Sequence, residues 1–280
     1  MKIFFLCICV PLAITACYTP RYVYSPAAQN VPTLTKKGDI NFTAYYSTSF
    51  AIKSKDATNN IKVKNSGADV QVAIAFNNHW AAQAAYFTRK ETNDGNYQSI
   101  TDSAVINYKR DAFDAGIGYF TPLPGRVNSY FQVFVGLGTG NYNFTDEGRN
   151  LNGFSYSRFH KAKALKCYFQ PAIMLWPSKN YSTAFSSRFT LIKFQNIKTS
   201  YNFTELNNYK LDSIAVSSTI FWEPALTNNI SFKHLPGIQI QMQAGFAFLL
   251  TRHFVDSRPF NFSLGLNAEL QKIFKRKGKS

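Results

Sequence analysis

The segment GIQIQMQAGFAFLL, residues 237–250, alternates between apolar side chains and polar or small ones at every second position. A helix would mix these two sets on its surface, whereas a β-strand places them on opposite faces. The apolar face would carry Ile238, Ile240, Met242, Ala244, Phe246 and Phe248, and the other face Gln239, Gln241, Gln243, Gly245 and Ala247. The segment therefore predicts a strand with one apolar face and one face that is polar but uncharged.

The same alternation recurs along the chain from Gly38 onward. FNFSLGLNAEL, residues 260–270, repeats it with Phe and Leu against Asn, Ser and Glu. Many of the alternating segments reach the ~9–11 residues that a tilted strand needs to cross a bilayer. The ten predicted strands are 39–51, 67–77, 80–90, 111–121, 129–143, 158–175, 181–195, 212–223, 237–250 and 260–273. The sixth to eighth segments are less regular, so eight or twelve strands are the alternatives.

The connections between these segments alternate in length. The short turns are NNH (77–79), PLPGRVN (122–128) and WPSKN (176–180). The intervening connections are long and polar, at 52–66, 91–110, 144–157 and 196–211. Short periplasmic turns alternating with long outer loops are typical of an outer-membrane barrel. The connection at 224–236 departs from the rule, because it is long yet falls at the short-turn end.

Composition favours a membrane barrel over a soluble β-sandwich. The chain has 26 Phe and 16 Tyr, while charged residues make up 16% against about 25% in an ordinary soluble domain. A sandwich would expose charged polar faces to water, whereas the polar faces here carry mostly Gln, Asn, Ser, Gly and Ala. We therefore expect an all-β fold over residues 38–274, a transmembrane antiparallel up-and-down β-barrel.

The N-terminal stretch has the features of an export signal, namely a basic residue, a short apolar core and small residues before Cys17. Its last four residues, Ile14-Thr15-Ala16-Cys17, resemble the lipobox of bacterial lipoproteins. This resemblance implies a lipoprotein signal peptide over 1–16, palmitate-type acyl chains on Cys17, and a lipidated Pro-rich periplasmic tether over 17–37. A plain secretory signal with an incidental cysteine is the alternative.

A wider resemblance concerns the Bacteroidetes. The stretch YTPRYVYSPAAQNVPTLTKKGDINFTAYYS, residues 18–47, resembles the start of a Bacteroidetes family of small outer-membrane β-barrel lipoproteins. DAFDAGIGYF and YFQVFVGLGTGNYNF, residues 111–120 and 130–144, resemble the central hairpin of that family. The family is defined by architecture, so the resemblance implies no chemistry. Surface-exported lipoproteins of this phylum carry acidic residues after the cysteine; their absence here places the expected anchor on the periplasmic side.

The net charge of +16 indicates polyanionic surroundings, and export excludes nucleic acid as a partner. On the predicted topology, one basic group lies at the outer rim, near lipopolysaccharide phosphates, and another in the tail at 275–280, near phospholipid headgroups. The rim group is Lys53, Lys55, Lys62, Lys64, Arg158, Lys161 and Lys163, and the tail group is Lys275, Arg276, Lys277 and Lys279. The expected partners are outer-membrane lipid, lipopolysaccharide and other envelope proteins.

Arg188 is predicted to face the lumen, where an unpaired arginine would be costly. Its candidate partners are Asp69, Asp114 and Glu269. These charges would either form a salt-bridge network that plugs the pore or a selectivity ring for small anions or neutral solutes.

Catalytic chemistry has weak support. A ten-stranded surface protease would need histidine and acidic residues at the outer rim, and the candidates are His160, His253, Asp256, Asp146 and Asp212. A phospholipase would need an activated serine beside a histidine on the lipid face, and neither remaining histidine, His79 or His234, is placed there.

Nucleotide, cofactor and metal sites are not expected either. GLGTG, Gly136–Gly140, lies inside a predicted strand and lacks the Lys-Ser/Thr of a phosphate-binding loop. Its glycines, with Gly116 and Gly118, are expected on the lumen face. Few histidines and cysteines remain after signal cleavage, and Cys167 is expected to act as a small apolar side chain.

The sequence thus predicts a non-catalytic, lipid-anchored outer-membrane barrel that serves as a structural or accessory subunit of an envelope complex. The alternatives are a small-solute pore and an integral protease or lipase.

Overall fold

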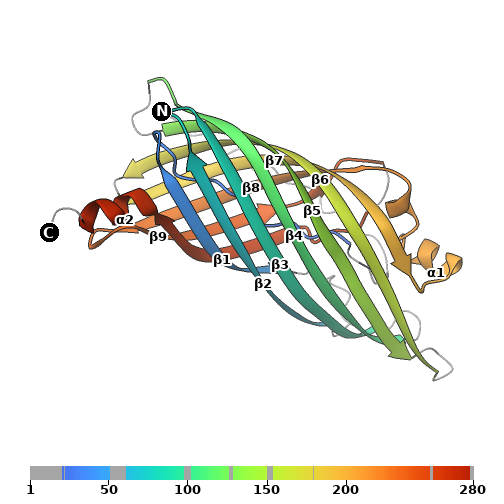
Figure 1. The fold of residues 1–280 in the computed structure, drawn as a ribbon. Helices are drawn as coiled ribbons and strands as arrows, with labels where there is room; N and C mark the ends of the chain where they lie inside the picture. The colour runs from blue at the N-terminus through green and yellow to red at the C-terminus, as the bar shows by residue number, and fades with distance from the viewer. Residues whose placement is uncertain are drawn as a thin grey trace, which may run out of the picture.

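The computed structural model describes residues 21, 23–50, 61–97, 102–125, 129–149, 154–178, 180–252 and 255–277. Ten long antiparallel strands, each paired with two neighbours, close into a barrel (Figure 1). The strands are β1 Ile40–Phe50, β2 Ile61–Ala75, β3 Trp80–Tyr97, β4 Asp102–Pro122, β5 Ser129–Arg149, β6 Ser155–Ser178, β7 Tyr181–Thr199, β8 Thr219–Phe232, β9 Leu235–Phe246, the short β10 Phe248–Leu249, and β11 Phe260–Glu269. The expected fold class and the count of ten strands are confirmed.

The barrel is polar inside and apolar outside. In β9, Gln239, Gln241 and Gln243 are buried in the lumen, while Phe246 on the opposite face is 44% exposed. Exposed apolar side chains recur around the wall, for example Leu137, which is 66% exposed. This arrangement is that of a transmembrane barrel, whose outer face meets lipid. None of the helices in the described part of the chain is long and apolar enough to span a membrane.

Several strands extend farther than predicted at the loop end, the end of the barrel opposite the tight turns at 76–79 and 233–234. β3 continues to Tyr97 and β4 begins at Asp102, so most of the expected 91–110 loop is a hairpin. In this extension Lys90, Thr92 and Asn107 face outward, so the outward face is polar too. The outer parts of β3 and β4 therefore lack the apolar–polar alternation by which a strand is recognised in the sequence. At the loop end, the wall formed by β3–β6 consequently extends beyond the rest of the barrel (Figure 1).

The predicted strand at 212–223 and the long connection at 224–236 are wrong. β8 runs from Thr219 to Phe232, and only Lys233 and His234 separate it from β9. Pro224 lies inside β8. The ladder from β8 to β9 begins at Ala225, and β10 pairs with Phe221 and Trp222. Pro224 therefore lies where this ladder is interrupted, a place that tolerates a residue without an N–H donor.

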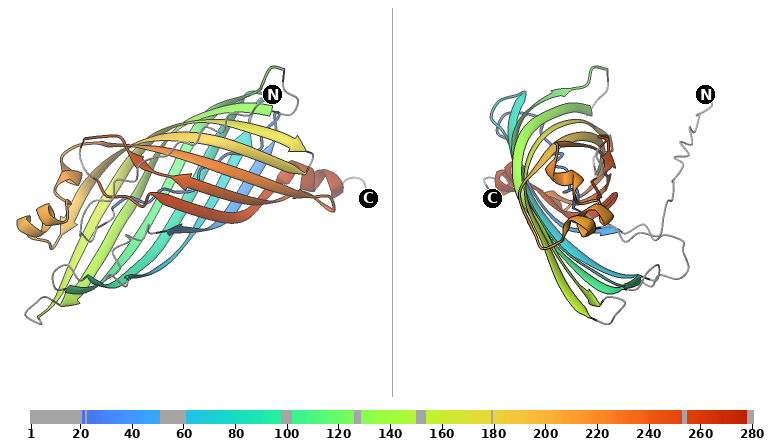
Figure 2. Two further views of the ribbon diagram at one scale, coloured as in Figure 1. Left: turned by 180° about the vertical axis from the view of Figure 1, so that it is seen from behind. Right: turned by 90° about the vertical axis from the view of Figure 1, so that its right-hand side faces the viewer.

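The Pro-rich segment expected as a periplasmic tether lies inside the barrel. Every residue from Val23 to Leu34, here called the lumen segment, is buried. Gly38, with φ of 82°, turns the chain into β1 at the short-turn end. From there the lumen segment runs toward the loop end, where Tyr24 bridges to Ser257. Figure 2 shows this dark blue chain within the ring of strands.

The loop end is covered by apolar side chains from the connection between β7 and β8. That connection contains α1, Phe203–Asn208, and a 3-10 turn at Ser213–Ala215. Asn202 and Glu205 form a reciprocal capping box that begins α1. The buried cluster includes Val23, Tyr24, Phe87, Ile106, Tyr142, Phe144, Phe194, Tyr201, Leu211, Ile214, Phe221 and Val255.

At the opposite end the last strand is shorter than predicted. β11 ends at Glu269 rather than continuing to residue 273, and the helix α2, Leu270–Lys277, follows it. Leu270, Ile273 and Phe274 recur at helical spacing, so α2 has an apolar side. The helix lies beside the short turns (Figure 1).

Two glycines make room for an aromatic ring in the wall. Gly116 in β4 and Gly136 in β5 are directly opposite each other. A Cβ atom at either position would overlap the side chain of Tyr168 from β6. The hydroxyl of Tyr168 accepts a hydrogen bond from Gln83 Nε2 at 3.0 Å, which fixes the ring against the glycines.

Replacing Gly136 with alanine should destabilise the barrel by about 1–3 kcal/mol, because the new methyl group displaces Tyr168. Gly245→Ala is the matched control, since its Cβ would lie at an ordinary 3.6 Å from that of Ala225. Urea unfolding in lipid vesicles measures both variants. Equal unfolding midpoints for the two alanine variants would contradict the steric explanation.

Candidate functional site: the filled lumen

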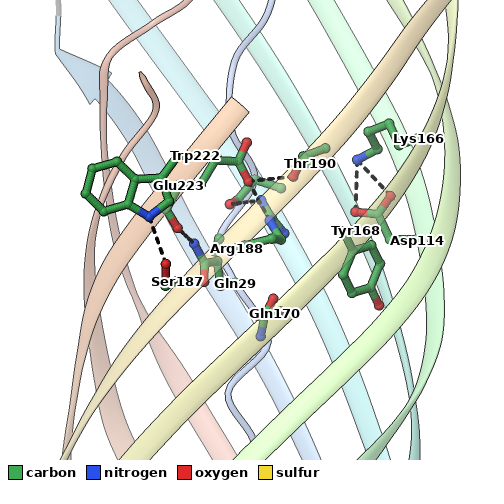
Figure 3. A network of polar contacts seen from close by, with 12 residues as sticks. Gln29, Asp114, Lys166, Tyr168, Gln170, Ser187, Arg188, Thr190, Trp222 and Glu223 are labelled. Carbon is green, nitrogen blue, oxygen red and sulfur yellow. Dashed lines mark hydrogen bonds and ion pairs between the residues drawn. The ribbon is translucent and has the colours of Figure 1, made fainter. Parts of the chain in front are cut away.

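The centre of the lumen is a hydrogen-bonded ion pair that holds the lumen segment (Figure 3). Arg188 in β7 and Glu223 in β8 are directly opposite, and Arg188 Nε lies 2.5 Å from Glu223 Oε2. Thr190 donates to the same carboxylate at 3.0 Å, and the Tyr24 hydroxyl donates to its other oxygen. Arg188 also donates to the backbone carbonyl of Ala27 at 3.2 Å. The pair therefore joins two wall strands and the lumen segment.

Glutamines of the wall satisfy the backbone of the lumen segment. Each donor is a side-chain Nε2 atom, and each acceptor is a backbone carbonyl of the segment. The contacts are Gln71 to Ala28 at 2.8 Å, Gln243 to Gln29 at 2.9 Å, Gln170 to Asn30 at 2.7 Å and Gln132 to Pro32 at 2.7 Å. Burying a backbone carbonyl without a partner costs about 1–3 kcal/mol. The lumen-facing glutamines thus do for this segment what a neighbouring strand does for a sheet.

The loop end of the lumen segment is held by Arg21. Its guanidinium lies 2.5 Å from Asp146 on β5 and 4.2 Å from the ring centre of Tyr209. Tyr201 donates to the same carboxylate at 2.8 Å. Burial, and secondarily the Asp146 charge, raise the pKa of Tyr201 far above its usual value. Arg21 therefore lies among residues of the loop end.

The segment 255–259 pairs with the lumen segment from the other side. The Asp256 carbonyl accepts from the N–H groups of Val23 at 3.0 Å and Tyr24 at 3.2 Å, and Arg258 N donates to Tyr24 O at 2.9 Å. Burial raises the pKa of the Asp256 carboxyl to about 6.

The buried cations described in the lumen have carboxylate partners. Buried cations each contact a buried carboxylate: Arg89 with Asp69 at 2.7 Å, Lys166 with Asp114 at 2.7 Å, Arg110 with Glu91 at 3.5 Å, and Arg258 also with Glu91. A buried charge without a partner would be strongly destabilising. The positive excess of the chain therefore lies outside the lumen.

All four residues of the predicted lumen network are buried, but their partners differ from the predicted ones. Arg188 pairs with Glu223, not with Asp69, Asp114 or Glu269. Glu269 instead accepts hydrogen bonds from Thr33 and Gln239 at the short-turn end, and Lys272 of α2 lies against it. The incorrect limits of β8 concealed the register that places Glu223 opposite Arg188.

Sequence reasoning missed most of the buried ions. Arg89, Arg110, Lys166 and Glu91 lie on lumen faces of strands. The alternation of each strand could have revealed them, because every second residue faces the lumen. In β3, Arg89 and Glu91 share a face with Phe87. Phe87 in turn lies opposite Asp69 of β2, which was already predicted to face the lumen. Arg258 lies outside the strands, so the alternation of strand faces could not predict its burial.

The predicted basic outer rim is only partly described. Lys53 and Lys55 lie outside the described residues, as does the side chain of Lys62. Lys64, Lys161 and Lys163 are exposed on the outward face of β2 and β6. Arg158 does not join them, because it pairs with Glu205 of α1 at 3.0 Å.

The predicted basic tail begins within a helix. Lys275, Arg276 and Lys277 belong to α2, although their side chains lie outside the described part, and Lys279 lies outside it altogether.

The candidate protease residues do not form a described catalytic group. The Asp146 carboxylate is bound by Arg21 and Tyr201. The His160 ring stacks on Phe144 at 5.1 Å, and neither ring nitrogen has a hydrogen-bond partner among the described residues. Asp212 is exposed near the 3-10 turn, and His253 falls outside the described residues. Within the described ranges, no three His, Cys, Asp or Glu residues cluster as metal ligands.

Several solved barrel structures are similar to this chain. The translocator domain of autotransporter NalP from Neisseria meningitidis is 12% identical, covering 84% of this chain and 90% of that one, with a TM-score of 0.49. The outer membrane protease OmpT from Escherichia coli is 11% identical, covering 82% of this chain and 93% of that one, with a TM-score of 0.46. The β domain of the Bordetella autotransporter Brka is 9% identical, covering 83% of this chain and 99% of that one, with a TM-score of 0.41. No protein-family model and no curated protein matches the sequence. At such low similarity the fold rests on the strand pairing above, and nothing about activity follows.

Replacing Arg188 with methionine should destabilise the barrel by about 3–5 kcal/mol, because Glu223 is left buried without its cation. The double variant Arg188→Met/Glu223→Gln removes both charges and should recover a large part of that loss. Urea unfolding in vesicles, analysed as a double-mutant cycle, measures the coupling. Strictly additive losses would contradict a direct ion pair.

Proposed function

We propose that this chain is an integral, lipid-anchored barrel of the bacterial outer membrane whose lumen is closed by its own N-terminal segment. The role that best fits a closed lumen is non-catalytic, as a structural or accessory subunit of an envelope complex. The observation that carries the proposal is the continuous burial of Val23–Leu34 inside the barrel. The apolar exterior supports the membrane location.

Hydrogen bonds and an ion pair fix the lumen segment to the barrel wall along its length. Wall glutamines bind its middle, Glu223 binds Tyr24, and Asp146 binds Arg21. At the short-turn end Leu34, Phe120 and Phe134 form a buried apolar cluster. At the other end the cluster that includes Tyr142 and Phe221 is buried. These features favour a closed barrel over the alternative of a small-solute pore.

The direction of the lumen segment bears on where its N-terminal end lies. Longer loops lie outside the cell and short turns in the periplasm in barrels of this type. Arg21 lies at the loop end, beside Tyr201 and Tyr209. Cys17 precedes Arg21 by four positions, a reach of at most about 14 Å of extended chain. We therefore place the lipid of Cys17 at the cell-surface side, in place of the periplasmic side expected from the residues after Cys17.

The resemblance to Bacteroidetes barrel lipoproteins belongs to the same proposal. The YTPRYVYSPAAQNVPTLTKKGD stretch that carries it is largely the lumen segment and its turn into β1. A role for this stretch in filling the lumen gives the resemblance a structural reason.

In planar bilayers the purified wild-type protein should give no steady single-channel steps, because its lumen is filled from end to end. A variant that lacks residues 21–35 should conduct, because the lumen segment that fills the barrel is absent. Refolding of both proteins is checked by heat-modifiable mobility on gels. Steady steps from the wild type would refute the closed barrel in favour of the pore.

An epitope inserted between Thr19 and Pro20 should be labelled by antibody on intact cells, because the chain leaves the lumen at the loop end. The same epitope between Lys233 and His234, in a short turn, is the matched control and should require permeabilised cells. Palmitate incorporation, compared with Cys17→Ser, measures the anchor in the same strain. Protection of the N-terminal epitope in intact cells would contradict the proposed direction, and equal palmitate labelling would contradict the anchor.

A further inference from the structure

We propose that a row of lysines on the outward face of β3–β7 binds the phosphate groups of an outer-leaflet glycolipid such as lipid A. This inference rests on the proposed orientation in the outer membrane. The row, here called the lysine row, consists of Lys90, Lys109, Lys161 and Lys198, with Asn143 between the second and third lysines.

The strand register places like charges directly against each other. Lys90 of β3 is opposite Lys109 of β4, and Lys161 of β6 is opposite Lys198 of β7. Directly opposite side chains in a sheet have Cβ atoms about 4.5–5.5 Å apart, and like charges at that distance are destabilising. A ligand that carries negative charge would relieve this repulsion.

In the part of the chain that the structure describes, the ion pairs do not include a lysine of the row. The buried carboxylates of these pairs face the lumen. Asp111 lies next to the row on the same face, and it accepts a hydrogen bond from Asn141 at 2.9 Å. Lys161 Nζ lies 5.6 Å above the ring of Phe159, a contact that leaves its N–H donors available to a ligand.

The lysines line a hollow large enough for a headgroup. A cavity of about 590 Å³ lies over β2–β6 and is lined by Lys64, Lys90, Lys109 and Lys161, together with polar side chains such as Asn107, Asn143 and Thr145. The ammonium groups supply donors and charge for phosphate. The amides and hydroxyls can bind the sugar hydroxyls of a glycolipid.

The position of the lysine row along the membrane normal favours a lipid over a soluble ligand. Tyr86, Phe113 and Leu165 form a parallel row on the same face and are 47%, 50% and 51% exposed. Each lies four residues nearer the short-turn end than a lysine of the row. Four residues span about 13 Å along a strand, or about 10 Å along the membrane normal at the usual tilt. A phosphate here would therefore lie just above acyl chains that contact Tyr86, Phe113 and Leu165.

The test uses the full-length protein in detergent, with lipid A and dephosphorylated lipid A as probes and native mass spectrometry as the readout. The variant Lys90→Gln/Lys109→Gln/Lys161→Gln should bind lipid A about tenfold to a hundredfold more weakly than the wild type. The control Lys36→Gln/Lys37→Gln/Lys233→Gln removes the same charge at the short-turn end and should bind as the wild type does. Dephosphorylated lipid A should bind weakly to all three proteins.

Thermal unfolding of the same proteins separates loss of binding from loss of fold. Without lipid, the lysine-row variant should be at least as stable as the wild type, because like-charge repulsion is removed. With lipid A, only the wild type and the control should gain stability. Equal binding by the lysine-row variant, or by dephosphorylated lipid A, overturns the proposal, and so does competition by millimolar inorganic phosphate. A wild type that conducts would instead refute the closed barrel and leave this site standing.

Discussion

A peptide chain can cross the inside of a barrel only if its N–H and C=O groups find partners there, since no neighbouring strand supplies them. In this protein the amides of lumen-facing glutamines take that role. Gln71, Gln132, Gln170 and Gln243 each donate to a carbonyl of the lumen segment. Together with the Arg188 contact to Ala27 and the backbone bonds to 255–259, these glutamine bonds hold the segment inside the lumen.

Charge is divided between the two faces of the wall for a physical reason. Inside, Arg188, Lys166 and Arg89 are each matched by a carboxylate, because a buried ion without a partner costs several kcal/mol. Outside, water and lipid headgroups screen the lysines, so the chain can keep an excess there. Much of the acidic side-chain content is used within the lumen, which is why the exterior is strongly basic.

The strands that face lipid could be predicted, because lipid on one side and a polar lumen on the other impose an alternation like that of Gln239–Met242. Above the membrane this contrast disappears, so the outer parts of β3 and β4 were assigned to a loop. The strand predicted at 212–223 was misplaced, because the ladder partners of β8 cannot be read from local sequence. The lumen segment has no periodicity, since its partners are side chains scattered over many strands. Its burial is a tertiary effect, and so is the Glu223 partner of Arg188.

The internal position of the N-terminal segment constrains the order in which the molecule can be assembled. β1 and β11 form the seam that closes the ring, and they come from opposite ends of the chain. A closed ring would have to admit Arg21 and a run of polar backbone past the inward-facing rings of Phe120 and Phe134. Wrapping the strands around the segment before the seam forms avoids that barrier.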